Sequence, residues 1–399
     1  MSQLSRRASA CAPSPTLAIT AKANKLKSEG ISVIAFGAGE PDFDTPDHIK
    51  AAAIDAIQKG FTKYTPSAGI PALKKAIIQK MQRDSNLVFC PEEVIVSCGG
   101  KHSLYNIFQV LVDENDEVII HAPYWVSYPE QVKLAGGTPV IVATSDADNF
   151  VPSLESIAAA ITDRTKIIII NSPSNPSGAM WPVARIREVA QLAADRGIFI
   201  ISDEIYEKLV YDGEFVSVAS LSPEIAKWTL TCNGMSKAYS MTGWRLGYVV
   251  GDKDIVAAMG RLQDQMTSNP TSITQHAGVA ALDGTQAYLD DWRSAFRSRR
   301  DVMVKGLNEV PGISCRVPQG AFYVFPNISG LYGKRTPGGV LLQSGDDFAD
   351  YLLEIKAVAV VPGSGFGSPD YVRLSYAIDL DSIAEGLRRI HEAVSELID

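Results

Sequence analysis

From about residue 94 to residue 202, continuous apolar stretches alternate with segments whose apolar residues recur at helical spacing. The apolar stretches have the length of strands and lie at residues 94–97, 117–123, 166–173 and 198–202. The intervening helical faces contain Leu104, Ile107, Phe108 and Leu111, and later Ile186, Val189 and Leu192. Apolar strands separated by amphipathic helices predict an α/β fold, with a parallel sheet covered by helices on both faces.

The pattern changes after about residue 285. Residues 288–307 predict a long helix with a polar face, and short strands are expected at 320–326, 357–363 and 371–377. The last helix repeats its apolar residues at intervals of four and three, at Ile383, Leu387, Ile390, Val394 and Leu397. These elements predict a smaller α+β domain over residues 286–399.

The N-terminal region is expected to complete this smaller domain. Residues 1–46 predict an arm that packs on it, in which Pro13 and Pro15 break any early helix. Residues 47–285 then form the large domain. The Gly-rich stretch 327–347 is weakly patterned, so we expect a loop there that is a candidate for a mobile lid.

Composition narrows the class of protein. Hydrophobic residues make up 46% and charged residues 21% of the chain, as in globular proteins with a large core. The net charge of −8 argues against nucleic-acid binding, which normally uses a concentrated basic face. No apolar run reaches the roughly 18 residues of a membrane span, and we find no export signal. The five cysteines and five histidines show no disulfide or metal-ligand spacing, so we expect a cytoplasmic protein without a metal site.

Unusual residues follow several predicted strands, and ligands of open parallel sheets bind beyond the carboxyl ends of the strands. After residues 94–97 come Gly99, Gly100, Lys101 and His102, which open a helix. The free N–H groups of a helix start attract an anion, most naturally a phosphate. A tight strand-to-helix turn explains the Gly-Gly pair equally well.

Polar side chains also follow the apolar runs of two later strands. Asn171 and Asn175 lie in a loop rich in proline, where asparagine is ordinarily a turn residue. Asp203 follows residues 198–202 and emerges from the interior of the sheet, where a carboxylate usually has a cationic partner. The alternative for Asp203 is a helix N-cap.

Residues 228–237 lead from a further predicted strand into Ser236-Lys237, and Arg245 follows eight positions after the lysine. This is the fourth strand end with unusual residues. A lysine among apolar and small residues is desolvated, which favours the neutral amine and a Schiff base with a carbonyl compound. Arg245 offers a planar donor fork for a phosphate. Alternatively, Lys237 is a surface residue and Arg245 a salt-bridge partner. Taken together, the four strand ends describe a pyridoxal 5′-phosphate site, in which Asp203 pairs with the pyridinium nitrogen.

Motifs along nearly the whole chain resemble those of class I (fold type I) pyridoxal-phosphate-dependent aminotransferases, in particular bacterial aspartate aminotransferases of the thermophile-like subgroup. The motifs that carry the resemblance are "GAGEPDFDTP" (37–46), "KYTPSAGIPALK" (63–74), "GGKHSLYN" (99–106), "PYWVSYP" (123–129), "NSPSNPSG" (171–178), "SDEIYE" (202–207), "SKAYSMTGWRLGY" (236–248) and "VRLSYA" (372–377). The resemblance implies a large cofactor-binding domain with a mostly parallel, seven-stranded type of sheet.

The resemblance also implies a role for each cofactor-binding residue. Lys237 would hold the cofactor covalently, and Asp203 would pair with the ring nitrogen. The other cofactor contacts would be Asn175 and Tyr206 at the ring hydroxyl, Trp125 on the ring face, and Gly100, Lys101 and His102 with Ser236 and Arg245 at the phosphate. Lys237, Asp203 and Tyr206 would be the catalytic residues.

The implied substrates are an L-amino acid, preferably aspartate, and a 2-oxo acid such as 2-oxoglutarate, in a ping-pong reaction. Arg373 would bind the α-carboxylate, with Gly39, Trp125 and Asn175 nearby, and Lys101 would bind the distal carboxylate. Tyr64 resembles the tyrosine that reaches the phosphate of the neighbouring subunit, which implies a homodimer with shared active sites.

Two positions depart from the family pattern. Gly234 stands where many relatives have a serine three residues before the lysine, and Ala12 stands where relatives have a basic residue. Ala12 makes prephenate or arogenate use uncertain, so aromatic and prephenate transamination stays an alternative. A C–S lyase of the same fold is a second alternative. A nicotinamide dehydrogenase would need a G-x-G-x-x-G motif, and a regulatory module would need a DNA-binding extension; neither is found.

Overall fold

The computed structural model describes residues 4, 5, 7, 9 and 11–399; residues 1–3, 6, 8 and 10 of the expected N-terminal arm lie outside this part. Within the described residues, seven strands form one sheet in the order β2-β8-β7-β6-β5-β3-β4. Only β8 runs antiparallel to its neighbours, so the predicted mostly parallel α/β sheet is confirmed. The strands are β2 (Val94–Ser97), β3 (Glu117–His121), β4 (Thr138–Val142), β5 (Thr165–Asn171), β6 (Phe199–Asp203), β7 (Thr229–Gly234) and β8 (Gly247–Val250).

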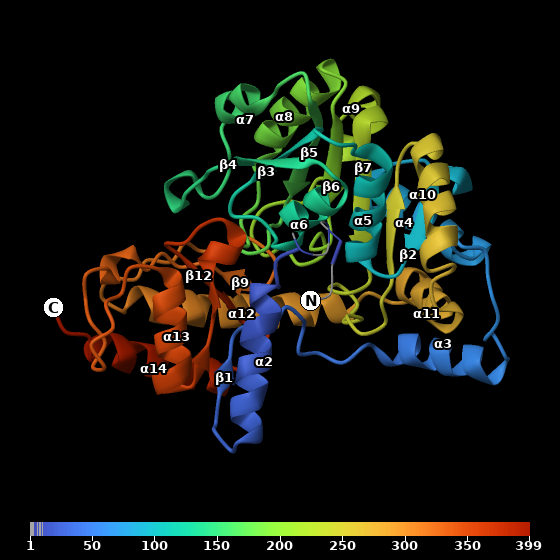
Figure 1. The fold of residues 1–399 in the computed structure, drawn as a ribbon. Coiled ribbons are helices and arrows are strands. Elements are labelled where there is room, and N and C mark those ends of the chain that lie inside the picture. The colour runs from blue at the N-terminus through green and yellow to red at the C-terminus, as the bar shows by residue number, and fades with distance from the viewer. Residues whose placement is uncertain (1–3, 6, 8, 10) are drawn as a thin grey trace.

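Helices cover both faces of this sheet (Figure 1). The helices of this unit are α3 (Asp47–Gln58), α4 (Pro71–Ser85), α5 (Gly100–Leu111), α6 (Ser127–Leu134), α7 (Leu154–Ala160), α8 (Val183–Asp195), α9 (Pro223–Trp228), α10 (Lys253–Met266) and α11 (Ser272–Asp283), of which α3 packs on α11. The packing of strand β5 explains why its sequence is continuously apolar. Ile167 and Ile169 pack in a cluster with residues of α5, α6 and α10, whereas Ile168 and Ile170 pack in another with residues of α7, α8 and α9. Both faces of the strand are therefore buried.

The second, smaller unit combines segments from both ends of the chain. Strand β1 pairs in parallel with β10, and α2 lies beside β10 and β11, as Figure 1 shows for the N- and C-terminal elements. A three-stranded sheet has the order β11-β12-β9 in the described chain. The elements are α2 (Pro15–Ser28), β1 (Ile34–Ala35), α12 (Tyr288–Asn308), β9 (Tyr323–Val324), α13 (Gly345–Lys356), β10 (Val358–Ala359), β11 (Val361–Pro362), β12 (Val372–Ser375) and α14 (Leu380–Ser395).

Helix α12 connects the two units. Its first turns place Leu289 and Trp292 in a core cluster with α3, α4 and α11, and its later turns place Phe296 and Leu307 in the core of the smaller unit. One helix therefore packs in both cores, which ties the two units together. The expected domain division after residue 285 stays a prediction.

The expectation for Pro15 is wrong, and two expected strands are shorter than predicted. Pro15 begins helix α2 instead of breaking it, because proline suits the first helical position and Ser14 caps the helix by accepting the Leu17 N–H at 3.5 Å. The strand expected at 320–326 is limited to β9, and the one expected at 357–363 is divided into β10 and β11.

Most of the stretch 327–347 forms the expected loop, before α13 begins at Gly345. All of its residues are described, and none of them lines the cavity at the sheet edge. Leu331 and Leu342 are buried in the core of the smaller unit, and Arg335 pairs with Ile398 through the backbone. The stretch packs against the C-terminus, and a role as a mobile lid stays a prediction.

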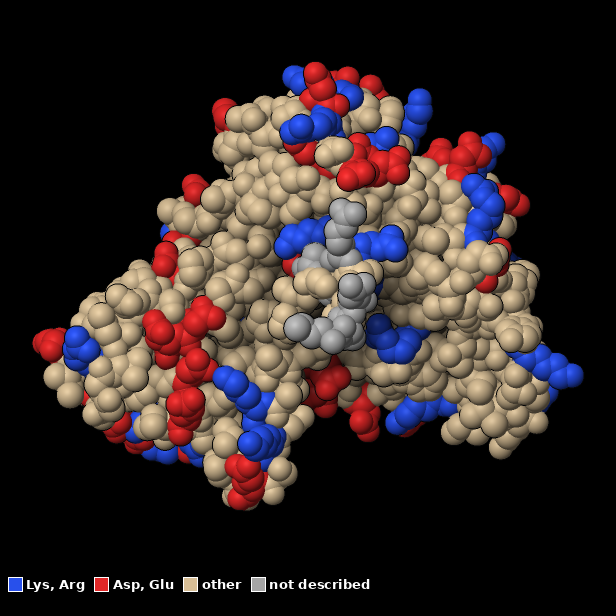
Figure 2. All heavy atoms as spheres, in the orientation of Figure 1, with Lys and Arg blue, Asp and Glu red and all other residues tan. Residues whose placement is uncertain are grey.

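Charged side chains of both signs lie in small groups over the face shown in Figure 2. Many of them form ion pairs along a helix surface, such as Arg388 with Glu385 and Glu392. Such exposed pairs contribute at most about 1 kcal/mol each. Among the described helices, none has both the length and the apolar composition needed to cross a membrane.

Candidate active site

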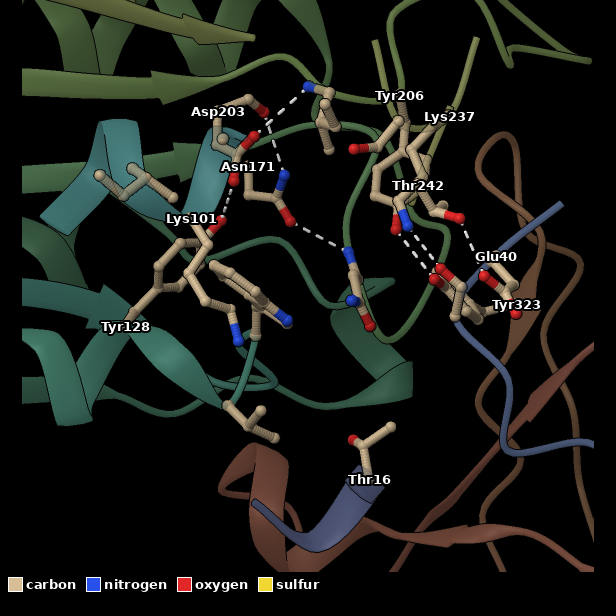
Figure 3. A pocket seen from close by; sticks show the side chains of 18 of the residues that line it. Thr16, Glu40, Lys101, Tyr128, Asn171, Asp203, Tyr206, Lys237, Thr242 and Tyr323 are labelled. Carbon is tan, nitrogen blue, oxygen red and sulfur yellow. Dashed lines mark hydrogen bonds between the residues drawn. The ribbon is translucent and has the colours of Figure 1, made fainter. Parts of the chain in front are cut away.

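A cavity of about 460 Å³ opens at the carboxyl ends of the parallel strands, between the two units (Figure 3). Every predicted site residue lines it except His102 and Tyr64. The larger unit contributes residues from the ends of β5, β6 and β7 and from the start of α5, and the smaller unit contributes Arg373 and Tyr323. The wall is completed by residues near the N-terminus, including Thr16 at the start of α2 and Gly39.

Lys237 projects into this cavity and is partly buried. Its amine donates a hydrogen bond to the carbonyl of Gly39, and it lies 5.8 Å from the ring centre of Phe322. Burial, and after it the charge of Arg373, lowers the pKa of Lys237 to about 8. A neutral amine is thus accessible near neutral pH, so the alternative of a surface lysine is excluded.

Asp203 ends strand β6 and is buried beside Cys232 of the neighbouring strand β7. Its Oδ2 accepts the Tyr128 hydroxyl at 2.6 Å, and its Oδ1 accepts the Ile205 N–H at 3.3 Å. Burial raises the pKa of Asp203 to about 6, although the hydrogen bond from Tyr128 acts in the opposite direction. No helix follows directly, since the next one in the described chain is α9, so the N-cap alternative is wrong.

The start of α5 and Arg245 form an anion cradle. Gly99 has a φ of +91°, and a Cβ there would lie 2.6 Å from Nη2 of Arg245, so glycine lets the guanidinium approach the turn. The N–H groups of Gly100 and Lys101 have no hydrogen-bond acceptor among the described residues. They point to an anion at the helix start.

His102 does not take part in this cradle. Its N–H donates to the Gly99 carbonyl at 3.0 Å, and its Nδ1 accepts the Cys98 N–H at 3.1 Å. The side chain is therefore occupied in holding the strand-to-helix turn. The predicted contact between the His102 N–H and the phosphate is therefore wrong, because this N–H already donates to Gly99 and His102 does not line the cavity.

Arg373 is a buried cation without a carboxylate partner in the described part of the chain. Its Nη1 donates to Oδ1 of Asn175 at 3.0 Å and its Nη2 to the Gly37 carbonyl at 2.9 Å, whereas Nε has no partner there. The guanidinium lies 4.6 Å from the ring centre of Tyr323. A buried charge is costly unless an anion balances it, so Arg373 indicates a binding site for a carboxylate.

Lys101 is the remaining predicted cation of the substrate side. Its amine lies 4.9 Å from the ring centre of Trp125, and burial, followed by the charge of Arg245, lowers the pKa of Lys101. Ala12 has no charge to add: its N–H donates to Oε2 of Glu130 at 2.9 Å, just before the α2 residues that line the cavity.

Gly234 lies outside the cavity lining, in the last position of β7. A Cβ there would be 2.9 Å from the Leu246 carbonyl oxygen and 3.1 Å from Cα of Gly247. A serine hydroxyl cannot be accommodated without a backbone shift. The backbone around Gly234 thus leaves little room for the serine that many relatives have, and Ser236 lines the cavity.

The sequence analysis missed several lining residues. Tyr128 is one of them, and its hydroxyl donates to Asp203. Tyr323 is another, and its hydroxyl lies 2.9 Å from that of Tyr206. Glu40 accepts the Thr242 hydroxyl at 2.9 Å across the cavity mouth. Tyr128 lies in the motif 123–129 that also contains Trp125, and this motif was the only signal for it. The others gave no signal, as their partners are distant in sequence.

The residues present fit pyridoxal 5′-phosphate. The cradle of free N–H groups and Arg245 suits its phosphate, and Lys237 suits its aldehyde. The buried Asp203 carboxylate suits a protonated ring nitrogen. Among the described side chains, no cluster of three His, Cys, Asp or Glu could hold a metal ion.

Known proteins are similar to this chain over almost its whole length. Residues 31–390 match the family of aminotransferase class I and II. The aspartate aminotransferase of Geobacillus stearothermophilus is 52% identical over 393 residues, which cover 98% of each chain. A probable aspartate/prephenate aminotransferase of Aquifex aeolicus is 46% identical and covers 99% of each chain. The crystal structure of the aspartate aminotransferase from Rhizobium meliloti matches with a TM-score of 0.96 and 46% identity, covering 100% of both chains.

Proposed function

Because the chain belongs to the family of aminotransferase class I and II, we propose that it transfers the amino group of aspartate to 2-oxoglutarate with pyridoxal 5′-phosphate as cofactor. One observation carries the proposal. The same cavity holds Lys237, a partly buried amine whose pKa is lowered to about 8, and Arg373, a buried cation with no carboxylate partner among the described residues. The first suits covalent attachment of an aldehyde, and the second suits a substrate carboxylate.

We assign the cofactor contacts to the lining residues. Lys237 would hold the cofactor covalently, and the N–H groups of Gly100 and Lys101 with Arg245 and Ser236 would hold its phosphate. The remaining contacts would be Asp203 at the ring nitrogen, Trp125 on the ring face, and Asn175 and Tyr206 at the ring hydroxyl. When bound, pyridoxal phosphate supplies the electron sink that allows a proton to leave the Cα of an amino acid.

The chain's own residues bind the substrate and move that proton. Arg373 clamps the α-carboxylate with two parallel N–H donors, which fixes the orientation of the Cα–H bond. Such positioning can lower a barrier by about 7 kcal/mol in favourable cases. Lys237, as a neutral amine, takes the proton from the substrate Cα and would deliver it to the cofactor carbon that bears the nitrogen, not back to Cα. The amino acid and the 2-oxo acid bind in turn at the same cavity, so we expect ping-pong kinetics.

Dicarboxylate preference rests on Lys101. Its amine lies in the cavity wall beside Trp125, at the end where a second carboxylate of aspartate or 2-oxoglutarate could bind. The Aquifex relative is described as a probable aspartate/prephenate enzyme, which favours prephenate as the second candidate substrate. Ala12 has no cationic side chain with which to bind prephenate. A C–S lyase activity stays a further alternative.

A half-reaction scan tests the proposal. Single amino acids are added to the purified enzyme, and the absorbance of the bound cofactor and the released 2-oxo acid are measured. Aspartate and glutamate should react fastest, and Lys237→Ala should lower the rate by about 10²–10⁴-fold or more. Borohydride reduction followed by peptide mapping should find the cofactor on Lys237. Pyruvate and ammonia formed without a 2-oxo acid acceptor would show a lyase; no reaction with any amino acid would refute the function.

We also propose a homodimer of cytoplasmic location with shared active sites. Tyr64 is 91% exposed and does not line the cavity of its own chain. Ile54, Ile57 and Phe61 are exposed nearby in sequence, which suits a surface that a second copy covers. Tyr64 would then reach the phosphate end of the partner's cavity.

A further inference from the structure

Tyr128 and Asp203 form a buried pair that the sequence did not predict. The hydroxyl of Tyr128, in the first turn of α6, donates to Oδ2 of Asp203 at 2.6 Å. Both side chains line the cavity, and their positions are visible in Figure 3. The tyrosine is 1% exposed and the aspartate 7% exposed, so water contributes little to the solvation of this carboxylate.

We propose that Tyr128 is the positioning residue for Asp203, because its hydroxyl holds the carboxylate ionised and oriented for the pyridine nitrogen of the cofactor. The inference rests on the proposed function, since that function supplies the ring nitrogen. An ionised carboxylate accepts about four hydrogen bonds. Within the described chain, Asp203 accepts two hydrogen bonds, one from the Tyr128 hydroxyl and one from the Ile205 N–H. The carboxylate therefore keeps acceptor capacity for a donor in the cavity.

The direction of the Tyr128 hydrogen bond supports this role. Burial, and after it the charge of Asp203, raises the pKa of Tyr128 well above its ordinary value, so the phenol stays protonated and donates. Burial raises the pKa of Asp203 to about 6, and the donated hydrogen bond opposes this rise. The other ionisable groups that act on Asp203 are Lys237, Tyr206 and Cys232. A donor to the charged form favours that form, which a protonated ring nitrogen needs as its partner.

The surroundings of Tyr128 keep it in place. Its ring stands at 82° to that of Trp125, with 5.3 Å between ring centres, and its N–H donates to the Trp125 carbonyl at 3.0 Å. One turn further, Nε2 of Gln131 donates to the Lys101 carbonyl at 2.9 Å. Helix α6 and the residues before it thus support the site at three points: the cavity wall at Trp125, the carboxylate of Asp203 and the start of α5.

The backbone of Asp203 is fixed separately. Nδ2 of Asn171 donates to the Asp203 carbonyl at 3.0 Å, and Oδ1 of Asn171 accepts the Asn175 N–H at 3.0 Å. The Asn171 contacts hold the chain around the site, whereas Tyr128 acts on the carboxylate itself. Removing only the Tyr128 hydroxyl should therefore favour the protonated, neutral form of Asp203 without moving the end of strand β6.

The test measures how strongly the apoenzyme binds two ligands: pyridoxal phosphate, and its analogue in which a C–H replaces the ring nitrogen. Tyr128→Phe should weaken the affinity for pyridoxal phosphate by about tenfold or more, because hydrogen bonds to charged groups are strong, and should change the affinity for the analogue much less. Tyr351→Phe is the matched control, since its buried hydroxyl donates to the Ala393 carbonyl at 3.1 Å, in the smaller unit. It should leave both affinities unchanged.

The inference is overturned if Tyr128→Phe lowers the affinity for both ligands equally, or for neither. A general structural role of Tyr128 would affect both ligands alike, because it does not depend on the ring nitrogen. If Tyr128→Phe does not fold, Tyr128→His, which keeps a ring N–H donor, replaces it. A preference for pyridoxal phosphate like that of the wild type then supports the role, and loss of that preference overturns it. Failure of the wild-type chain to bind pyridoxal phosphate would instead refute the proposed function.

Discussion

Nη1 of Arg373 donates a hydrogen bond to Oδ1 of Asn175 at 3.0 Å, which brings a cation of the smaller unit to an amide of the larger unit. Arg373 lies in strand β12, and Asn175 lies in the loop after β5. The contact joins the two units at the cavity wall. Because the described chain offers Arg373 no carboxylate, its charge is available for a ligand at this junction.

Replacing Arg373 with lysine should lower kcat/KM for aspartate by about 10- to 100-fold, because the ammonium is a point charge and lacks the planar fork that binds a carboxylate through two donors. Steady-state kinetics at varied aspartate concentration measure the effect. Arg388→Lys on the exposed face of α14 is the control and should keep wild-type kinetics. Unchanged kinetics in Arg373→Lys would show that the substrate carboxylate binds elsewhere.

The stability of the apoprotein should depend on pH through Lys237. Its folded pKa of about 8 lies below the value of 10.5 for a free lysine, so the unfolded chain binds more protons between these values and the free energy of unfolding rises with pH. At pH 7 this burial costs about 3 kcal/mol. Lys237→Met should therefore be more stable than the wild type at pH 7 and lose most of this advantage by pH 10.

Denaturant unfolding of both apoproteins at the two pH values checks the Lys237 prediction. Comparing the same pair of proteins at each pH cancels the effects of the substitution that do not depend on protons. A stability difference that stays constant from pH 7 to pH 10 would contradict a lowered pKa of Lys237.

Shared active sites predict complementation between two inactive variants. In a mixed dimer of Tyr64→Ala and Lys237→Ala chains, one cavity combines Lys237 of one subunit with Tyr64 of the other, so it is unaltered. Random mixing of subunits in a symmetric dimer should recover about a quarter of the wild-type sites. Activity is measured after joint refolding. Activity equal to the sum of the separate variants would mean that Tyr64 serves no neighbouring site.

Introducing a hydroxyl at position 234 should not improve phosphate binding. A Cβ at Gly234 would press on the Leu246 carbonyl oxygen and on Gly247, so Gly234→Ser should destabilise the fold by about 1–3 kcal/mol. Denaturant midpoints and the affinity for pyridoxal phosphate are the measurements. Ala38→Ser, at another lining position, provides a comparison in which the added hydroxyl is near the cavity. Tighter cofactor binding in Gly234→Ser would contradict the packing described here.

Much of the fold follows from local patterns. The apolar runs that became β2, β3, β5 and β6 are buried on both faces, so no polar alternation obscures them. The smaller unit was harder to predict. Its strands β9, β10 and β11 have two residues each in the structure, which is too short for a period of two to show. Pro15 was misjudged because proline both ends and begins helices, and only the Ser14 cap distinguishes the two.

The sequence by itself determined that apolar strands alternate with helices and that polar chemistry lies at the strand ends: Lys237, Asp203 and Arg245 each follow or precede a recognisable strand. Only the tertiary structure decided the partners of these groups. Tyr128 and Asp203 are 75 positions apart, and Arg373 and Asn175 are 198 apart. Periodicity reports which face of an element is buried, whereas a contact between distant segments depends on how those elements pack, and that packing leaves no regular trace in either segment.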